Sequence, residues 1–108
     1  MNDRPKESDW KRYSKIIPEV RDRYLDRKNE EIVSILHDQA RTPTDRFWDA
    51  REKSDQVAKA LEDCLGYHSR SKMFTSMVLM LRYGMITEKD LAGFSQELQD
   101  RLLAFLQI

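Results

Sequence analysis

The sequence is poor in the residues that build the most recognisable functional sites. Among its 108 residues are one cysteine, two histidines and three glycines. Cys64 alone cannot form an internal disulfide, and nothing else indicates an oxidising compartment, so we expect a cytoplasmic location. The glycine spacing fits neither the Walker nor the dinucleotide-binding fingerprint, which argues against both of these phosphate-binding loops.

The sequence also lacks an excess of charge of one sign, and it has no long run of apolar residues. The 19 basic and 19 acidic side chains cancel, so the chain lacks the overall positive field that drives non-specific binding to nucleic acid. The most apolar stretch, residues 73–81, has about half the length of a bilayer-spanning helix. Residues 1–9 have no apolar segment of the kind found in secretory signals. We therefore expect no membrane insertion.

The pattern of apolar residues predicts an all-α fold. No segment alternates polar and apolar residues for long enough to form a strand, and prolines and glycines fall where helices should begin or end. We predict a four- to five-helix bundle built from two antiparallel helical hairpins. Its helices are expected at about residues 9–17, 18–38, 43–65, 69–83 and 88–106. Residues 1–7 should be a flexible polar N-terminus, and residues 8–108 a single helical domain.

Local capping signals give the expected helix boundaries. Pro18 suits the first turn of a helix, where its missing N–H costs nothing, so we expect a kink near it. Thr42 before Pro43 is a typical helix start. Gly66 should end the third helix in the left-handed conformation. A capping box is predicted at residues 87–90, with an acidic side chain three residues after the threonine.

A polar gap is predicted between the second and third helices. In an antiparallel pair that turns near residues 39–42, Tyr24 faces Val57 and Val33 faces Trp48. Between these contacts both helices carry charged residues, and we call this region the polar waist: Glu30, Glu31, Arg51, Glu52 and Asp55. One interpretation is a polar pocket or metal cluster, but the Glu-x-x-His pairs of carboxylate-bridged metal sites are absent. The other is a solvated strip of ion pairs, which we favour.

The start of the fourth helix is locally basic. Its first residues are His68, Ser69, Arg70 and Lys72. Free N–H groups at a helix start favour anions, so these four residues are candidates for binding a phosphate or carboxylate. Ordinary serine capping with solvated cations is the simpler explanation.

Five apolar residues are expected at the joined end of the second and third helices. We call them the apolar tip: Ile32, Ile35, Leu36, Phe47 and Trp48. The third helix is longer than the fourth, so this tip should extend beyond the second hairpin. Either the first helix, residues 9–17, or a second copy of the chain must cover it. We favour the second copy, because two-fold dimers are the commonest oligomers.

These features predict a small helical protein-interaction or regulatory module that forms a homodimer through the apolar tip. No motif assigns the chain to a family, and no catalytic residue, metal ligand or cofactor is predicted. A binding module for a phosphorylated ligand or nucleic acid, using the basic start of the fourth helix, is the alternative. Nucleic acid is the less favoured ligand, because the last helix carries more acidic than basic residues. An enzyme using Glu30, Glu31 and Glu52 as acid or base is the least favoured class.

Overall fold

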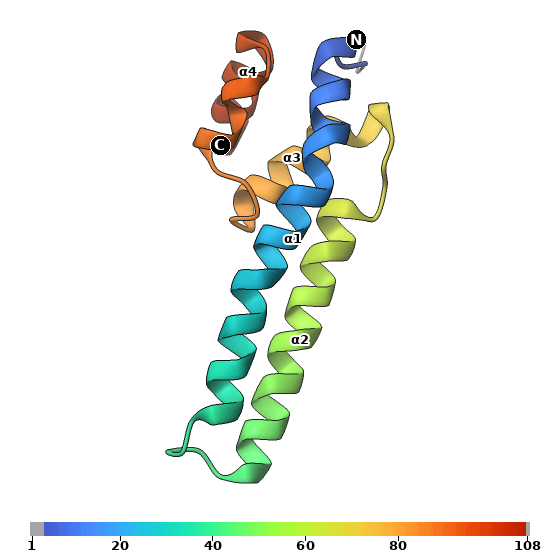
Figure 1. Ribbon diagram of the computed structural model, residues 1–108. Helices are drawn as coiled ribbons and strands as arrows, with labels where there is room; N and C mark the ends of the chain where they lie inside the picture. The colour runs from blue at the N-terminus through green and yellow to red at the C-terminus, as the bar shows by residue number, and fades with distance from the viewer. Residues whose placement is uncertain (1–3, 108) are drawn as a thin grey trace.

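The computed structural model describes residues 4–107 and is all-α, with no strand in that range (Figure 1). The elements in chain order are α1 (Glu7–His37), α2 (Pro43–Leu65), the short 3₁₀ helix η1 (Arg70–Lys72), α3 (Met73–Arg82), the 3₁₀ helix η2 (Glu88–Gly93) and α4 (Gln96–Leu106). The prediction of an all-α helical bundle is confirmed. Part of the predicted flexible N-terminus, residues 1–3, lies outside the described residues; Glu7 already belongs to α1.

The first two predicted helices are one continuous helix, so the expected boundary at Pro18 is wrong. α1 runs for 31 residues with Pro18 inside it. A proline within a helix removes one hydrogen bond and costs roughly 3 kcal/mol. On both sides of Pro18, however, Tyr13, Ile17 and Val20 are buried in the core. These three side chains share one face only if the helix continues through Pro18. Burying each of them stabilises the fold by about 1.5–3 kcal/mol, which offsets the cost of the proline.

The last predicted helix, residues 88–106, is divided into η2 and α4. The break occurs at Phe94 and Ser95, which are extended, and the Ser95 hydroxyl caps α4 by accepting a hydrogen bond from the N–H of Leu98 at 3.2 Å. Both the N–H and the hydroxyl of Ser95 donate to the carboxylate of Asp9, at 2.8 and 2.6 Å. The N–H of Ser95 is therefore not available to a continuing helix, and the chain turns here.

The remaining boundaries follow the capping signals in part. The side chain of Thr42 caps α2, and the carboxylate of Asp90 accepts from the N–H of Thr87 at 2.8 Å, as the capping box predicts. Gly66 was expected to be left-handed, but its φ of −67° is right-handed. Among residues 4–107, Gly84 is the one with positive φ, at 73°, and it lies in the turn after α3. The helix predicted from residue 69 begins as η1 before α3.

The core lies at one end of the molecule. It combines the first half of α1 and the second half of α2 with α3, η2 and α4. Four methionines and Cys64 are almost completely buried in it: Met73, Met77, Met80 and Met85. Polar contacts also fasten α1 to the segment after α3, with Arg23 paired to Asp90 at 2.9 Å and Arg27 donating to the carbonyl of Gly84 at 2.9 Å.

The other half of the α1–α2 pair projects from this core. Figure 1 shows α1 and α2 lying side by side, with their joined end extending away from α3 and α4. Between residues 26 and 56, a segment that we call the arm, Ala50 is the only buried residue. The radius of gyration is 16.6 Å, against about 13 Å expected for a compact domain of this size. The arm therefore has little packing beyond its own two helices.

Within residues 4–107, no helix combines the length and the apolar character needed to cross a membrane.

Candidate functional site

The loop that joins the two helices of the arm is held by hydrogen bonds, including three between a side chain and the backbone. The carboxylate of Asp38 accepts from the N–H of Ala40 at 3.0 Å, and the hydroxyl of Thr42 accepts from the N–H of Asp45 at 3.1 Å. The guanidinium of Arg46 donates across the arm to the carbonyl of Leu36 at 3.2 Å. These bonds fix the ends of α1 and α2 relative to each other, so the side chains at this end have defined positions.

Large apolar side chains are nevertheless exposed at this ordered end. Val33, Leu36, Phe47 and Trp48 are 51%, 47%, 56% and 59% exposed, respectively. The rings of Phe47 and Trp48 meet edge to face, with centroids 5.0 Å apart. Phe47 and Trp48 therefore form an exposed aromatic patch, and contiguous apolar patches are candidate interaction surfaces.

The structure places the predicted tip residues unequally. Leu36, Phe47 and Trp48 are exposed, whereas Ile32 and Ile35 are half-buried. Val33 and Trp48 were expected to face each other, but both are more than half exposed. Ala50 is instead the buried residue on the α2 side of the arm. We add Val33 to the apolar tip; its position three residues before Leu36 could have identified it.

The first helical segment does not cover the apolar tip. Residues 9–17 belong to the opposite end of the continuous α1 helix. Their apolar side chains are used in the core, where Tyr13, Ile16 and Ile17 are each less than 9% exposed. The intramolecular explanation for the tip is therefore excluded for this segment.

No family model, curated protein or solved structure matches this chain. The site must therefore be interpreted from its own geometry and charge.

The polar waist is a strip of ion pairs, exposed along α2 and partly buried where Lys28 and Lys53 lie between the helices. Glu31 lies 3.1 Å from Lys28 in its own helix and 3.6 Å from Lys53 in α2. Arg51 and Asp55 pair with each other along α2, at 3.5 Å, with both side chains more than 60% exposed. These residues do not converge on a single point, and Glu30 and Glu52 are exposed.

The electrostatics of the waist do not favour acid–base catalysis. The hydrogen bond from Lys28 lowers the pKa of Glu31, as does the charge of Lys53. A carboxyl group that acts as an acid near neutral pH needs a raised pKa, which burial away from cations would provide. Within residues 4–107, no group of three or more histidine, cysteine or acidic side chains is placed to hold a metal ion.

Arg70 and His68 before α3 are engaged by the start of α1, whereas Lys72 is exposed. Arg70 pairs with Glu7 at 3.1 Å and lies over the ring of Trp10, 5.1 Å from its centroid. His68 packs against the same ring, with the centroids 4.7 Å apart, and is 3.3 Å from the hydroxyl of Ser14. Arg70 and His68 line a groove together with Ser69 and Glu7. An anion in this groove would compete with the carboxylate of Glu7, which weakens the case for an anion site.

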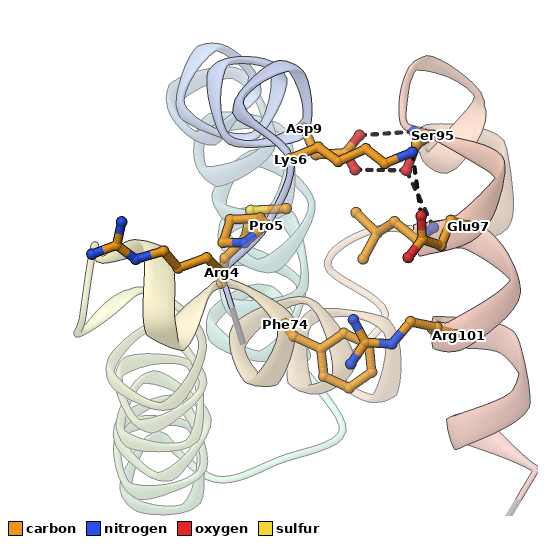
Figure 2. Close-up of a pocket in the computed structure, with 10 residues that line it drawn as sticks. Arg4, Pro5, Lys6, Asp9, Phe74, Ser95, Glu97 and Arg101 are labelled. Atoms are coloured by element: carbon orange, nitrogen blue, oxygen red, sulfur yellow. Dashed lines mark hydrogen bonds and ion pairs between the residues drawn. The ribbon is translucent and has the colours of Figure 1, made fainter. Parts of the chain in front are cut away.

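A small cleft lies where the start of α1 meets α4 (Figure 2). Asp9, only 4% exposed, directs both carboxylate oxygens at Ser95, and Lys6 pairs with Glu97 at 3.2 Å. Figure 2 shows Arg101 beside the ring of Phe74 at the other end of this cleft. Its volume of about 100 Å³ is small beside the roughly 300–1,000 Å³ of typical small-molecule sites. These contacts explain how α4 is attached to α1.

Cys64 is not placed as a nucleophile. Its side chain is fully buried, and burial raises its pKa from 9.0 to about 12. A reactive cysteine needs an accessible thiolate, which this environment opposes. His68, four residues later, instead stacks on aromatic rings of α1.

Proposed function

We propose that this chain is a non-catalytic helical protein-interaction module that self-associates through the arm. The observation that carries the proposal is the group of four large apolar side chains, each about half exposed, at an ordered end of the molecule: Val33, Leu36, Phe47 and Trp48. The occupant that we assign to this surface is a second copy of the chain.

The energetics of the arm support this proposal. Two helices that bury only Ala50 between residues 26 and 56 gain little free energy from their own packing. Most of the stability of a helix in a protein comes from tertiary packing of its apolar face. Burying the exposed parts of Val33, Leu36, Phe47 and Trp48 against another protein surface would supply that packing, at about 25 cal/mol per Å² of apolar area.

The oligomeric state tests the proposal directly. Light scattering on the purified chain should give the mass of a dimer, and Phe47→Glu should shift the mass to that of the monomer, because it would place a charge in the contact. Tyr67→Glu is the matched control, since Tyr67 is an exposed aromatic residue, 72% accessible, outside the arm. This control should remain dimeric.

Two results would overturn self-association through the arm. One is a monomeric wild type at every concentration tested. The other is a Phe47→Glu variant that stays dimeric while circular dichroism shows unchanged helix content.

A further inference from the structure

We propose that two copies pair side by side through one face of the α1–α2 hairpin, in antiparallel orientation, and not tip to tip. This inference rests on the self-association proposed above and assigns the contact to residues beyond the apolar tip. The far face, as we call this surface, is the side of the hairpin that α3 and α4 do not cover. Its residues are Leu25, Asn29, Ile32, Val33 and Leu36 on α1 and Phe47, Arg51, Ser54, Ala58 and Leu61 on α2.

On α1 the far face follows from helical spacing. At about 100° per residue, Leu25, Asn29, Ile32 and Leu36 recur at steps of four, three and four and form one stripe. Ile32 is half-buried and Leu36 is 47% exposed, while Leu25 packs against the edge of the core. The stripe therefore connects the apolar tip to the core without a charged residue in its line.

On α2 the same face is apolar at its ends, and Arg51, Ser54 and Ala58 lie between them. Phe47, Arg51, Ser54, Ala58 and Leu61 follow at steps of four, three, four and three. The guanidinium of Arg51 pairs with Asp55 along α2 at 3.5 Å and its side chain is 62% exposed, so it can stay paired at the edge of the face. The hydroxyl of Ser54 donates to the carbonyl of Ala50 at 2.9 Å, so its hydrogen bond is made within α2. Ser54 can consequently be covered by another chain without losing its hydrogen bond.

The opposite side of the hairpin is already occupied or charged. There Arg23 and Arg27 reach Asp90 and the carbonyl of Gly84. Further along the arm, the Lys28–Glu31–Lys53 ion pairs lie between the two helices. Burial of such charges is costly, so the far face is the side on which a second copy can pack.

The area required by a stable dimer selects side-by-side pairing. Specific interfaces bury roughly 800 Å² on each partner. Two helices about 10 Å apart present a face roughly 20 Å wide, and the 23 residues of α2 extend for about 34 Å. Their product, about 700 Å² per copy, falls within the usual range. A tip-to-tip contact, limited to the width of the two helix ends, covers only a fraction of that area.

Antiparallel pairing matches the large residues of α2 to each other. A two-fold axis across the helices near Ser54 sets α2 against α2 of the second copy, so that residues at equal distances on either side of Ser54 meet. Phe47 of each copy then lies over Leu61 of the other. The small side chains of Ser54 and Ala58 allow the helices to approach closely at the axis.

Cysteine cross-linking tests this arrangement. Ser54→Cys should give a disulfide-linked dimer on mild oxidation, because the two introduced thiols lie next to the axis. Thr44→Cys at the end of the arm and Glu30→Cys on its charged side should stay uncross-linked. Cys64 does not interfere, because it is fully buried. A cross-link at Thr44→Cys without one at Ser54→Cys would overturn side-by-side pairing and leave self-association intact, whereas a monomeric wild type would overturn both.

A surface substitution gives a second readout that does not depend on disulfide geometry. Ala58→Arg places a long charged side chain on the far face at an exposed position, and we expect it to raise the dimer dissociation constant at least about tenfold. Gln56→Arg, on the opposite side of the same helix, should leave the constant unchanged. Equal constants for the two variants would contradict the assignment of the far face.

Discussion

At the scale of single residues, Cys64 has the most perturbed chemistry in the core. Its side chain has no accessible surface, and burial raises its pKa from 9.0 to about 12. Burial likewise raises the pKa of Tyr13 and Tyr24 above 10.0. All three groups are neutral in the folded protein at a pH where their unfolded counterparts begin to ionise.

This predicts that the protein loses stability in alkali. When pH rises above 9.0, the unfolded chain releases the Cys64 proton while the folded chain keeps it, so the free energy of unfolding falls. The slope should approach about 1.4 kcal/mol per pH unit for each such group between its unfolded and folded pKa. Urea denaturation at several pH values from 7 to about 11 measures this slope. Cys64→Ala lowers stability at neutral pH through the lost packing, and should show a shallower alkaline slope. Equal slopes in the two proteins would contradict the role given to Cys64.

Long-range contacts of single residues were beyond the reach of the sequence. Asp9 and Ser95 are 86 positions apart, and no local pattern around either residue indicates that they meet. The Asp9 contact divides the predicted helix of residues 88–106. The Thr42 and Asp90 caps, in contrast, depend on neighbours three residues away, and both were predictable.

At the scale of elements, the two prolines in helices have opposite energetic roles. Pro18 lies inside α1, where its ring lacks an N–H and crowds the carbonyl of the preceding turn. Pro43 lies at the first position of α2, where no intrahelical hydrogen bond is lost. Thr42 marks Pro43 as a helix start, whereas Pro18 follows Ile17 with no capping residue before it, and the burial of Ile17 and Val20 places it in a helix interior.

We therefore predict that Pro18→Ala stabilises the protein. The substitution restores one backbone hydrogen bond at an exposed position. It also gives the unfolded chain more conformational entropy, which opposes this gain. We expect a net increase of about 1–2 kcal/mol in the free energy of unfolding. Pro43→Ala, the matched control, should leave stability unchanged or lower it by up to about 1 kcal/mol. Chemical denaturation followed by circular dichroism measures both. A loss of stability in Pro18→Ala would show that α1 depends on the distortion imposed by its proline.

The arm was partly predictable at this scale. The low apolar content of residues 26–31 and 49–56 correctly indicated that this part of the hairpin lacks a core. The far face was not predicted, because Asn29, Ser54 and Ala58 are neither large nor charged. Their shared orientation becomes apparent only when the position of α3 and α4 identifies the covered side of the hairpin.

At the scale of the whole molecule, the structure divides into a well-packed core and an arm with few contacts of its own. The long dimension is 53 Å, about twice either of the others, so the arm extends well away from the core. In such a molecule the two halves of the α1–α2 hairpin differ in local stability, because local opening is easiest where few apolar contacts must be broken. A second copy on the far face would reduce that difference.

This argument predicts that thermal stability depends on protein concentration. A partner that binds only the folded state raises the free energy of unfolding by mass action, so the melting temperature of the wild type should increase as the protein is concentrated. Phe47→Glu, which carries a charge on the far face and should not pair, should melt at a constant temperature over the same range. Amide hydrogen exchange can locate the contact. The exchange rates of residues 26–56 should fall at high protein concentration, while the rates in α3 should stay the same. Pairing through the far face must protect the amides of the arm. If light scattering shows a dimer but exchange in the arm does not depend on concentration, the contact lies on another surface.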